Sequence, residues 1–148
     1  MPILTGTVHT TLPRDEAFAY IADWSRQAEW DPNTVSVQRI GEGGPEVGAR
    51  YAMEVTLMGS RTGTMEYRIT ELEAPSRLVL VGEGSGLTAE DTITFSQTDE
   101  GTAVEYRADI KLNGLLRFAE PLLARTFDGI TQGVVQGMKR ELDARASA

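Results

Sequence analysis

The sequence contains no cysteine and only one histidine, His9, among its 148 residues. The absence of cysteine excludes disulfides, thiolate metal ligands and a cysteine nucleophile. A single histidine excludes clustered histidine metal sites and leaves a serine–histidine–aspartate triad with one candidate base. That histidine falls on the polar face of a predicted strand, which favours a surface position over a catalytic one. We therefore expect no metal site.

Positive charge is scarce as well, because 14 Lys and Arg residues face 22 Asp and Glu residues and the net charge is −8. Nucleic-acid phosphates require a basic face, so we expect no nucleic-acid partner. No stretch approaches the ~20 apolar residues that cross a bilayer, and the first residues lack the basic and apolar regions of a secretory signal. These absences predict a cytoplasmic protein with no integral membrane segment.

What is present fits one folded domain over 1–148, because 41% of the residues are hydrophobic and no linker-like stretch divides the chain. The apolar pattern predicts, in order, one strand, two short helices, an antiparallel meander of six strands and one long helix. The expected bounds are 3–12 for the first strand, 13–22 and 25–30 for the short helices, 34–112 for the meander and 121–145 for the long helix. A start of the long helix at Leu115 is the alternative. The glycine-rich stretches Gly41–Gly44 and Gly82–Gly86 lie between predicted strands, so we interpret them as turns rather than phosphate-binding loops and expect no cofactor.

Apolar residues should oppose apolar residues across the meander, which predicts how its strands pair. A turn about Ser60 gives the pairs Tyr51 with Ile69, Met53 with Tyr67 and Val55 with Met65. A turn about Asp99–Gly101 gives the pairs Phe95 with Val104, Ile93 with Tyr106 and Asp91 with Ala108. The pairs place three tyrosines and two methionines on the inward face with the apolar residues.

Asp91 is the one carboxylate that this register turns inward. A desolvated carboxylate has a raised pKa and could exchange protons with a bound ligand. A one-residue bulge near the start of its strand would turn Asp91 to solvent instead, and we favour this alternative. Tyr67 and Tyr106 would each offer a hydroxyl on an apolar ring, which suits the orientation of a ligand carbonyl as well as it suits core packing.

The long helix carries one apolar stripe, formed by Leu123, Phe127, Ile130, Val134 and Met138 and flanked by Leu142. We expect this stripe to lie on the sheet. The helix interior also contains three glycines, Gly129, Gly133 and Gly137. Each glycine costs about 1 kcal/mol relative to alanine. Either close packing against a neighbouring element or room for a bound molecule would compensate, and we favour close packing.

Short motifs accompany this order of elements, namely Asp23-Trp24 and Glu29-Trp30-Asp31-Pro32 after the first helix and Gly101-Thr102 at the last strand. Together with the leucine-rich closing helix, they resemble the START-like (SRPBCC) superfamily of polyketide cyclases/dehydrases and lipid-transport proteins over nearly the whole chain. The resemblance implies a helix-grip fold of the α+β class, in which a curved seven-stranded antiparallel sheet wraps around the C-terminal helix. It also implies a hydrophobic pocket between sheet and helix. Trp30 matches the tryptophan that the superfamily carries after its second helix.

The mouth of this pocket should lie at one end of the sheet. The turns near Gly59 and Gly84–Gly86 fall at the same end of the meander, where the last strand also finishes at Asn113-Gly114. The residues expected to form an apolar lip there are Met58, Leu87, Leu115, Leu116 and Phe118. Such a lip would admit a lipid-like molecule, and a buried satellite cluster is the alternative.

Our leading hypothesis is that the chain binds or transports a small hydrophobic molecule of the lipid, polyketide or isoprenoid type. The candidate ligand-binding residues are Trp30, Met53, Val55, Met65, Tyr67, Ile93, Tyr106, Leu123, Phe127, Ile130 and Val134. The resemblance offers a polyketide aromatase/cyclase as the alternative, with Asp91, Tyr67 and Tyr106 as candidates to steer aldol closure and dehydration. A regulatory interaction module without a ligand is a further alternative. The sequence leaves open whether the chain forms a homodimer.

Overall fold

The computed structural model describes residues 3–56 and 60–147. The strands are β1 (Ile3–Thr10), β2 (Thr34–Ile40), β3 (Arg50–Thr56), β4 (Thr62–Glu73), β5 (Arg77–Gly84), β6 (Leu87–Thr98) and β7 (Gly101–Leu112). The helices are α1 (Arg14–Ala22), the 3-10 helices η1 (Trp24–Glu29) and η2 (Gly114–Ala119), and α2 (Glu120–Ala146). The predicted order of elements is confirmed, with one additional short helix, η2, before α2 and with two differences of extent. The first strand ends at Thr10, and β5 continues through Gly82 and Gly84, which were predicted to belong to the turn.

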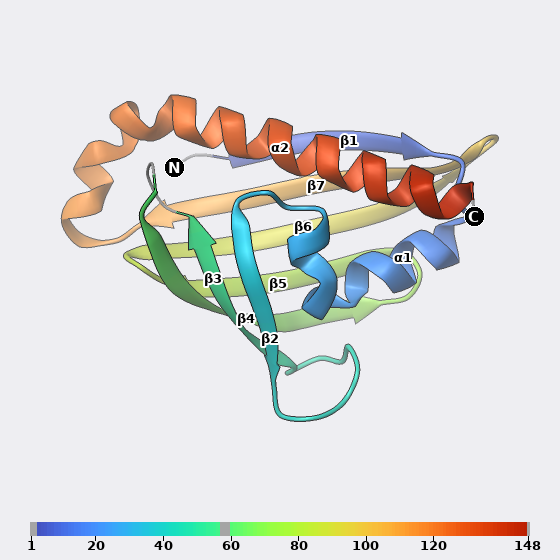
Figure 1. The fold of residues 1–148 in the computed structure, drawn as a ribbon, viewed down its shortest axis with the longest axis horizontal. Helices are drawn as coiled ribbons and strands as arrows, with labels where there is room; N and C mark the ends of the chain where they lie inside the picture. The colour runs from blue at the N-terminus through green and yellow to red at the C-terminus, as the bar shows by residue number, and fades with distance from the viewer. Residues whose placement is uncertain (1–2, 57–59, 148) are drawn as a thin grey trace.

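One antiparallel sheet contains all seven strands, in the order β1-β7-β6-β5-β4-β3-β2. The strands curl so that α2 runs alongside β1 and β7, as Figure 1 shows. In the same view, α1 lies near the C-terminal end of α2, and η2 with the start of α2 lies at the opposite end of the sheet (Figure 1). The predicted helix-grip architecture is confirmed. The two ends of α2 therefore have different neighbours.

The predicted register between β3 and β4 is wrong by two residues. Tyr51 pairs with Tyr67 and Met53 pairs with Met65. A shift of two residues keeps every side chain on its predicted face, because side chains alternate with a period of two. The predicted register would also have set Glu54 opposite Glu66, and like charges directly opposite each other are unfavourable. In the structure Glu54 faces Thr64, and Glu66 instead forms an ion pair with Arg50 over 3.4 Å.

The predicted register between β6 and β7 is confirmed, including the pair of Asp91 with Ala108. The favoured bulge that would have turned Asp91 to solvent is absent, since the β5–β6 and β6–β7 ladders run through this residue without a shift. Asp91 is therefore turned inward and is only 4% exposed. By contrast, His9 on β1 is exposed, as its strand alternation predicted.

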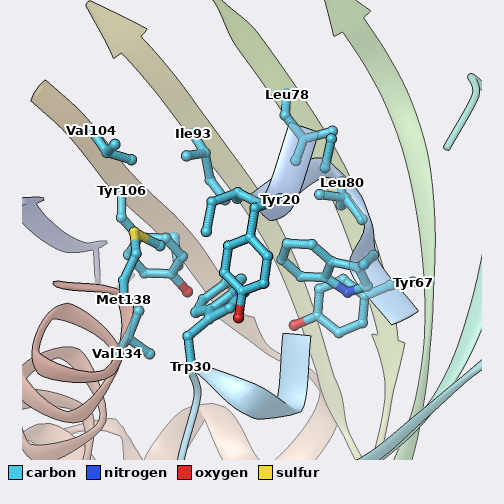
Figure 2. Close-up of a cluster of buried hydrophobic side chains, with 14 of the residues drawn as sticks. Tyr20, Trp30, Tyr67, Leu78, Leu80, Ile93, Val104, Tyr106, Val134 and Met138 are labelled. Carbon is cyan, nitrogen blue, oxygen red and sulfur yellow. The ribbon is translucent and has the colours of Figure 1, made fainter. Parts of the chain in front are cut away.

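The solid part of the core lies under the C-terminal half of α2. Ile93 and Val104 from the sheet, Met138 from α2 and Trp30 belong to one cluster of buried hydrophobic side chains (Figure 2). Trp30 packs edge to face on Trp24, with ring centroids 5.5 Å apart. The indole Nε1 of Trp24 in turn lies 3.4 Å from the sulfur of Met53. Two large indole rings thus fill the space between η1, the sheet and α2.

The same end of α2 is tied to α1 and η1 by polar contacts. Tyr20 donates its hydroxyl to the carboxylate of Glu29 over 2.9 Å. Arg145 approaches the same carboxylate at 3.4 Å, and its guanidinium lies 3.6 Å from the centroid of the Tyr20 ring. Side-chain packing and these polar contacts close this end of the molecule. The N-terminal half of α2 does not take part in them.

Candidate functional site

A cavity of about 270 Å³ lies between the sheet and the N-terminal half of α2. Its wall is mostly apolar, and the apolar side chains that line it are Leu4, Met53, Val55, Met65, Leu87, Ala89, Ala108, Ile110, Leu112, Leu123, Phe127 and Ile130. The inward face of the curled sheet and the first turns of the α2 stripe supply these residues, because alternate residues on every strand face α2. The cavity exists because small residues such as Ala89 and Ala108 stand where larger side chains fill the core further along the same strands.

Asp91 and Tyr106 form a hydrogen-bonded pair in this cavity. The Tyr106 hydroxyl lies 3.4 Å from Oδ2 of Asp91 and donates to it, while Oδ1 of Asp91 has no hydrogen-bond partner among the described residues. Burial raises the pKa of Asp91 to about 7, and the negative charge of Asp31 raises it as well, against a lowering effect of the Tyr106 hydrogen bond. Asp91 can therefore both take up and release a proton near neutral pH.

Tyr67 contributes a second hydroxyl to the cavity wall. Its ring lies over Gly82 of the neighbouring strand, and a Cβ at that glycine would stand 2.5 Å from the ring. The glycine thus makes room for the tyrosine. Burial raises the pKa of both Tyr67 and Tyr106 well above the usual range, and the charge of Asp91 acts in the same direction. Both hydroxyls therefore stay protonated and are able to donate hydrogen bonds.

Asp31 is a functional candidate that sequence reasoning missed, since it stood out in the sequence only as part of a motif after the first helix. Its carboxylate accepts hydrogen bonds from the side chain of Gln27 at 2.8 Å, from the backbone N–H of Asn33 at 2.8 Å and from the hydroxyl of Thr34 at 3.1 Å. Burial raises the pKa of Asp31 in spite of these three donors. A sequence signal existed: an Asx turn explains why an aspartate precedes Pro32-Asn33, but it does not show that the turn lies on a cavity.

Most of the predicted ligand-binding residues line the cavity, namely Met53, Val55, Met65, Tyr67, Tyr106, Leu123, Phe127 and Ile130. Trp30, Ile93 and Val134 do not, because the structure places them in the solid core, where each is at most 1% exposed. Position along the elements accounts for the difference. Ile93 lies two residues beyond Asp91 toward the filled end of β6, and Val134 lies one turn beyond Ile130 on α2.

The cavity reaches the surface where β4 begins and β5 ends. Arg61 and Ser85 line it there and are exposed, and the predicted lip residue Leu87 lines it beside them. Leu115 and Phe118 of η2 are 85% and 70% exposed, and they do not line the cavity. Met58 and the side chain of Leu116, also predicted for the lip, lie outside the described residues.

The described residues contain no group of three or more His, Cys, Asp or Glu side chains that could hold a metal ion. None of the described helices is long and apolar enough to cross a membrane.

A curled seven-stranded sheet that wraps one long helix, with a cavity between them, defines a START-like fold. Residues 1–143 match the family model described as "Polyketide cyclase / dehydrase and lipid transport", and the chain therefore belongs to this family. No curated protein matches the chain in sequence.

Solved structures share the fold at low sequence identity. The Zhui aromatase/cyclase from Streptomyces sp. R1128 is 15% identical, with a TM-score of 0.82 over 98% of this chain and 95% of that one. The di-domain aromatase/cyclase StfQ from the steffimycin biosynthetic pathway is 16% identical, with a TM-score of 0.76 over 99% of this chain and 52% of that one. A START superfamily protein from Mycobacterium smegmatis is 9% identical, with a TM-score of 0.75 over 96% of this chain and 97% of that one. At these identities the likeness shows the fold alone.

Proposed function

We propose that this chain binds a small, largely apolar molecule of the lipid, polyketide or isoprenoid type in the cavity between the sheet and α2. The observation that carries the proposal is the cavity itself, which is lined mainly by apolar side chains and open at one end. Its volume of about 270 Å³ lies near the lower end of ligand pockets, which run from roughly 300 to 1,000 Å³. Met53 and Met65 add side chains that adapt to varied apolar shapes.

Native mass spectrometry of the protein purified from its own host tests this function. We expect a retained small molecule, which should be lost in an Ala108→Leu variant because Ala108 lines the cavity. Ala52→Leu is the matched control, since Ala52 is exposed on the outer face of the sheet. A folded protein that retains no molecule and also fails to bind an apolar fluorescent probe would contradict the proposal.

The polyketide aromatase/cyclase is the second candidate, and it is favoured by the inward position of Asp91 beside Tyr106. In an aldol closure, the Asp91 carboxylate would remove a proton from a carbon between two carbonyls. The resulting enolate carbon would bond to a second carbonyl carbon, and the new alkoxide would take a proton from the Asp91 carboxylic acid. Loss of this hydroxyl and a neighbouring proton as water completes the dehydration.

The two candidates separate in a turnover assay with a poly-β-keto substrate. Asp91→Asn keeps the shape of the side chain but cannot exchange the proton, so an enzyme should lose turnover while it keeps substrate binding. A binding protein should show no turnover in either form. A ligand-free interaction module, the further alternative, would be favoured by an interior filled by its own side chains, and the cavity of about 270 Å³ supports it less than it supports ligand binding.

A further inference from the structure

The cavity contains buried acceptors that lack donors. Oδ1 of Asp91 and Oε1 of Gln27 have no hydrogen-bond partner among the described residues. Both residues line the cavity, and they are only 4% and 3% exposed. A buried polar atom without a partner costs free energy, which a ligand that brings a donor recovers. The orphan acceptors therefore indicate a ligand that donates hydrogen bonds.

The charged groups around the cavity also favour a ligand that donates hydrogen bonds. The titratable or charged groups that line the cavity with Asp91 are Asp31 after η1, Tyr67 on β4, Tyr106 on β7 and Arg61 ahead of β4. The described lining residues of α2 are uncharged. Arg61 is exposed at the mouth, so the enclosed part of the cavity holds two carboxylates and no described cationic side chain. When both are ionised, this interior attracts a positive charge.

We propose that the bound molecule is a hydrophobic amine, whose protonated nitrogen pairs with Asp91 while its apolar body lies against the cavity wall. The inference rests on the binding function proposed above and names the ligand class. Tyr106 already donates to Oδ2 of Asp91, which leaves Oδ1 for the ammonium group. Met65 and Phe127 offer the apolar contact surface.

Other ligand classes fit these groups less well. A carboxylate would bring a third negative charge beside Asp31 and Asp91, and it would donate nothing to the orphan acceptors. A ketone also only accepts hydrogen bonds, so it can pair with Asp91 only while that side chain is protonated. An alcohol can donate one hydrogen bond but leaves the charge of the carboxylates uncompensated.

Isothermal titration calorimetry with three matched probes tests the ligand class: naphthylethylamine, naphthylethanol and naphthylacetate. At pH 8, where Asp91 is ionised, we expect the amine to bind about tenfold or more tightly than the alcohol, because both can donate a hydrogen bond to the carboxylate but only the ammonium group also compensates its charge. The acid should bind most weakly. Equal affinities for amine and alcohol would overturn the ligand class while leaving the binding function intact. If none of the probes binds, the binding function fails, and the inference fails with it.

Proton release supplies a second measurement that needs no variant. Ammonium binding favours the ionised carboxylate, so at pH 7 the amine should release about half a proton per ligand when Asp91 has a pKa of about 7. Titrations in two buffers of different ionisation enthalpy measure this number. Naphthylethanol should release almost none. Proton uptake with the amine would contradict the pairing.

Substitutions test whether the carboxylate of Asp91 is the group that pairs with the ammonium nitrogen. Asp91→Asn should remove most of the amine's advantage and leave the affinity for naphthylethanol within about threefold, because the amide keeps the shape. Glu90→Gln is the matched control, since it removes one negative charge from the exposed face of the same strand and should leave both affinities unchanged. A folded Asp91→Asn protein that keeps its preference for the amine would overturn the proposal. If this variant does not fold, the buffer measurement on the native protein decides.

Discussion

The carbonyl oxygen of Trp30 lies so close to Gly137 that a Cβ at this position would overlap with it. Gly133, one turn earlier on α2, is similarly close to Pro32, whose Cγ lies 2.9 Å from the corresponding Cβ position. These two glycines let α2 approach the segment that follows η1. Gly129 differs, because no atom of the described residues lies within 4 Å of its Cβ position. The prediction that close packing explains the glycines is confirmed for two of them.

We predict opposite effects of alanine at two of these positions. Gly137→Ala should lower the free energy of unfolding by about 1–3 kcal/mol or more, because the methyl group forces the helix away from the Trp30 backbone. Gly129→Ala should raise it by about 0.5–1 kcal/mol, since alanine favours the helix and meets nothing there. Urea unfolding of both variants checks this pair. A neutral Gly137→Ala would show that the helix moves without cost.

Tryptophan substitutions should separate the cavity from the core along α2. Phe127→Trp places a larger ring in the cavity wall and should weaken the binding of an apolar fluorescent probe while the protein stays folded. Val134→Trp overpacks a position that is 1% exposed and should cost about 1–3 kcal/mol of stability. Probe titration and urea unfolding, each measured on both variants, give the comparison. Unchanged probe affinity in a folded Phe127→Trp variant would argue against the site.

The sequence predicted which face each strand residue occupies, but it did not predict how far along the sheet the cavity extends. Alternation assigned Met53, Met65 and Tyr106 to the inward face, and all three line the cavity. The same alternation assigned Ile93 to that face, yet its position is filled by the core. Whether an inward side chain meets a cavity or another side chain depends on the helices that cover it, and no periodicity in one strand contains that information.

Asp31 and Asp91 show that the sequence also predicts the positions of polar cavity residues only in part. The Asp91 register was predictable because Ile93 and Phe95 fix the face of β6. The favoured solvent position of Asp91 was wrong, because the strand has no bulge there. Burial raises the pKa of this carboxyl group to about 7, and protonation avoids much of the cost of burying a charge. Asp31 comes to the cavity through the fold of η1 against the sheet, which a single sequence does not encode locally.

Removal of the Tyr106 hydroxyl should raise the pKa of Asp91 further. The hydroxyl donates to Oδ2 of Asp91 and so favours the ionised carboxylate. Tyr106→Phe should therefore shift the titration upward from about 7, as measured by NMR of the carboxyl carbon. Tyr67→Phe is the matched control, because Tyr67 makes no hydrogen bond to Asp91 in the described structure. A downward shift in Tyr106→Phe would contradict the assigned direction of the hydrogen bond.

The stability of the native protein should fall as the pH rises from about 4 to about 7, through the titration of Asp91. Its pKa is raised from 3.8 to about 7 on folding, so the folded state holds more protons than the unfolded state across this window. Stability therefore decreases with pH there and levels off above the folded pKa, with a contribution of order a few kcal/mol.

Asp91→Asn removes this titration, so it should stabilise the protein at pH 8 by of order a few kcal/mol and have little effect near pH 4. Urea unfolding of both proteins at several pH values measures the difference. Asp99→Asn serves as the control, because Asp99 is exposed in the turn between β6 and β7 and its replacement should not change the pH profile. If Asp91→Asn were instead less stable than the native protein at pH 8, the carboxylate would be held by favourable interactions in its ionised form, and its role as a proton-exchanging group near neutral pH would have to be abandoned.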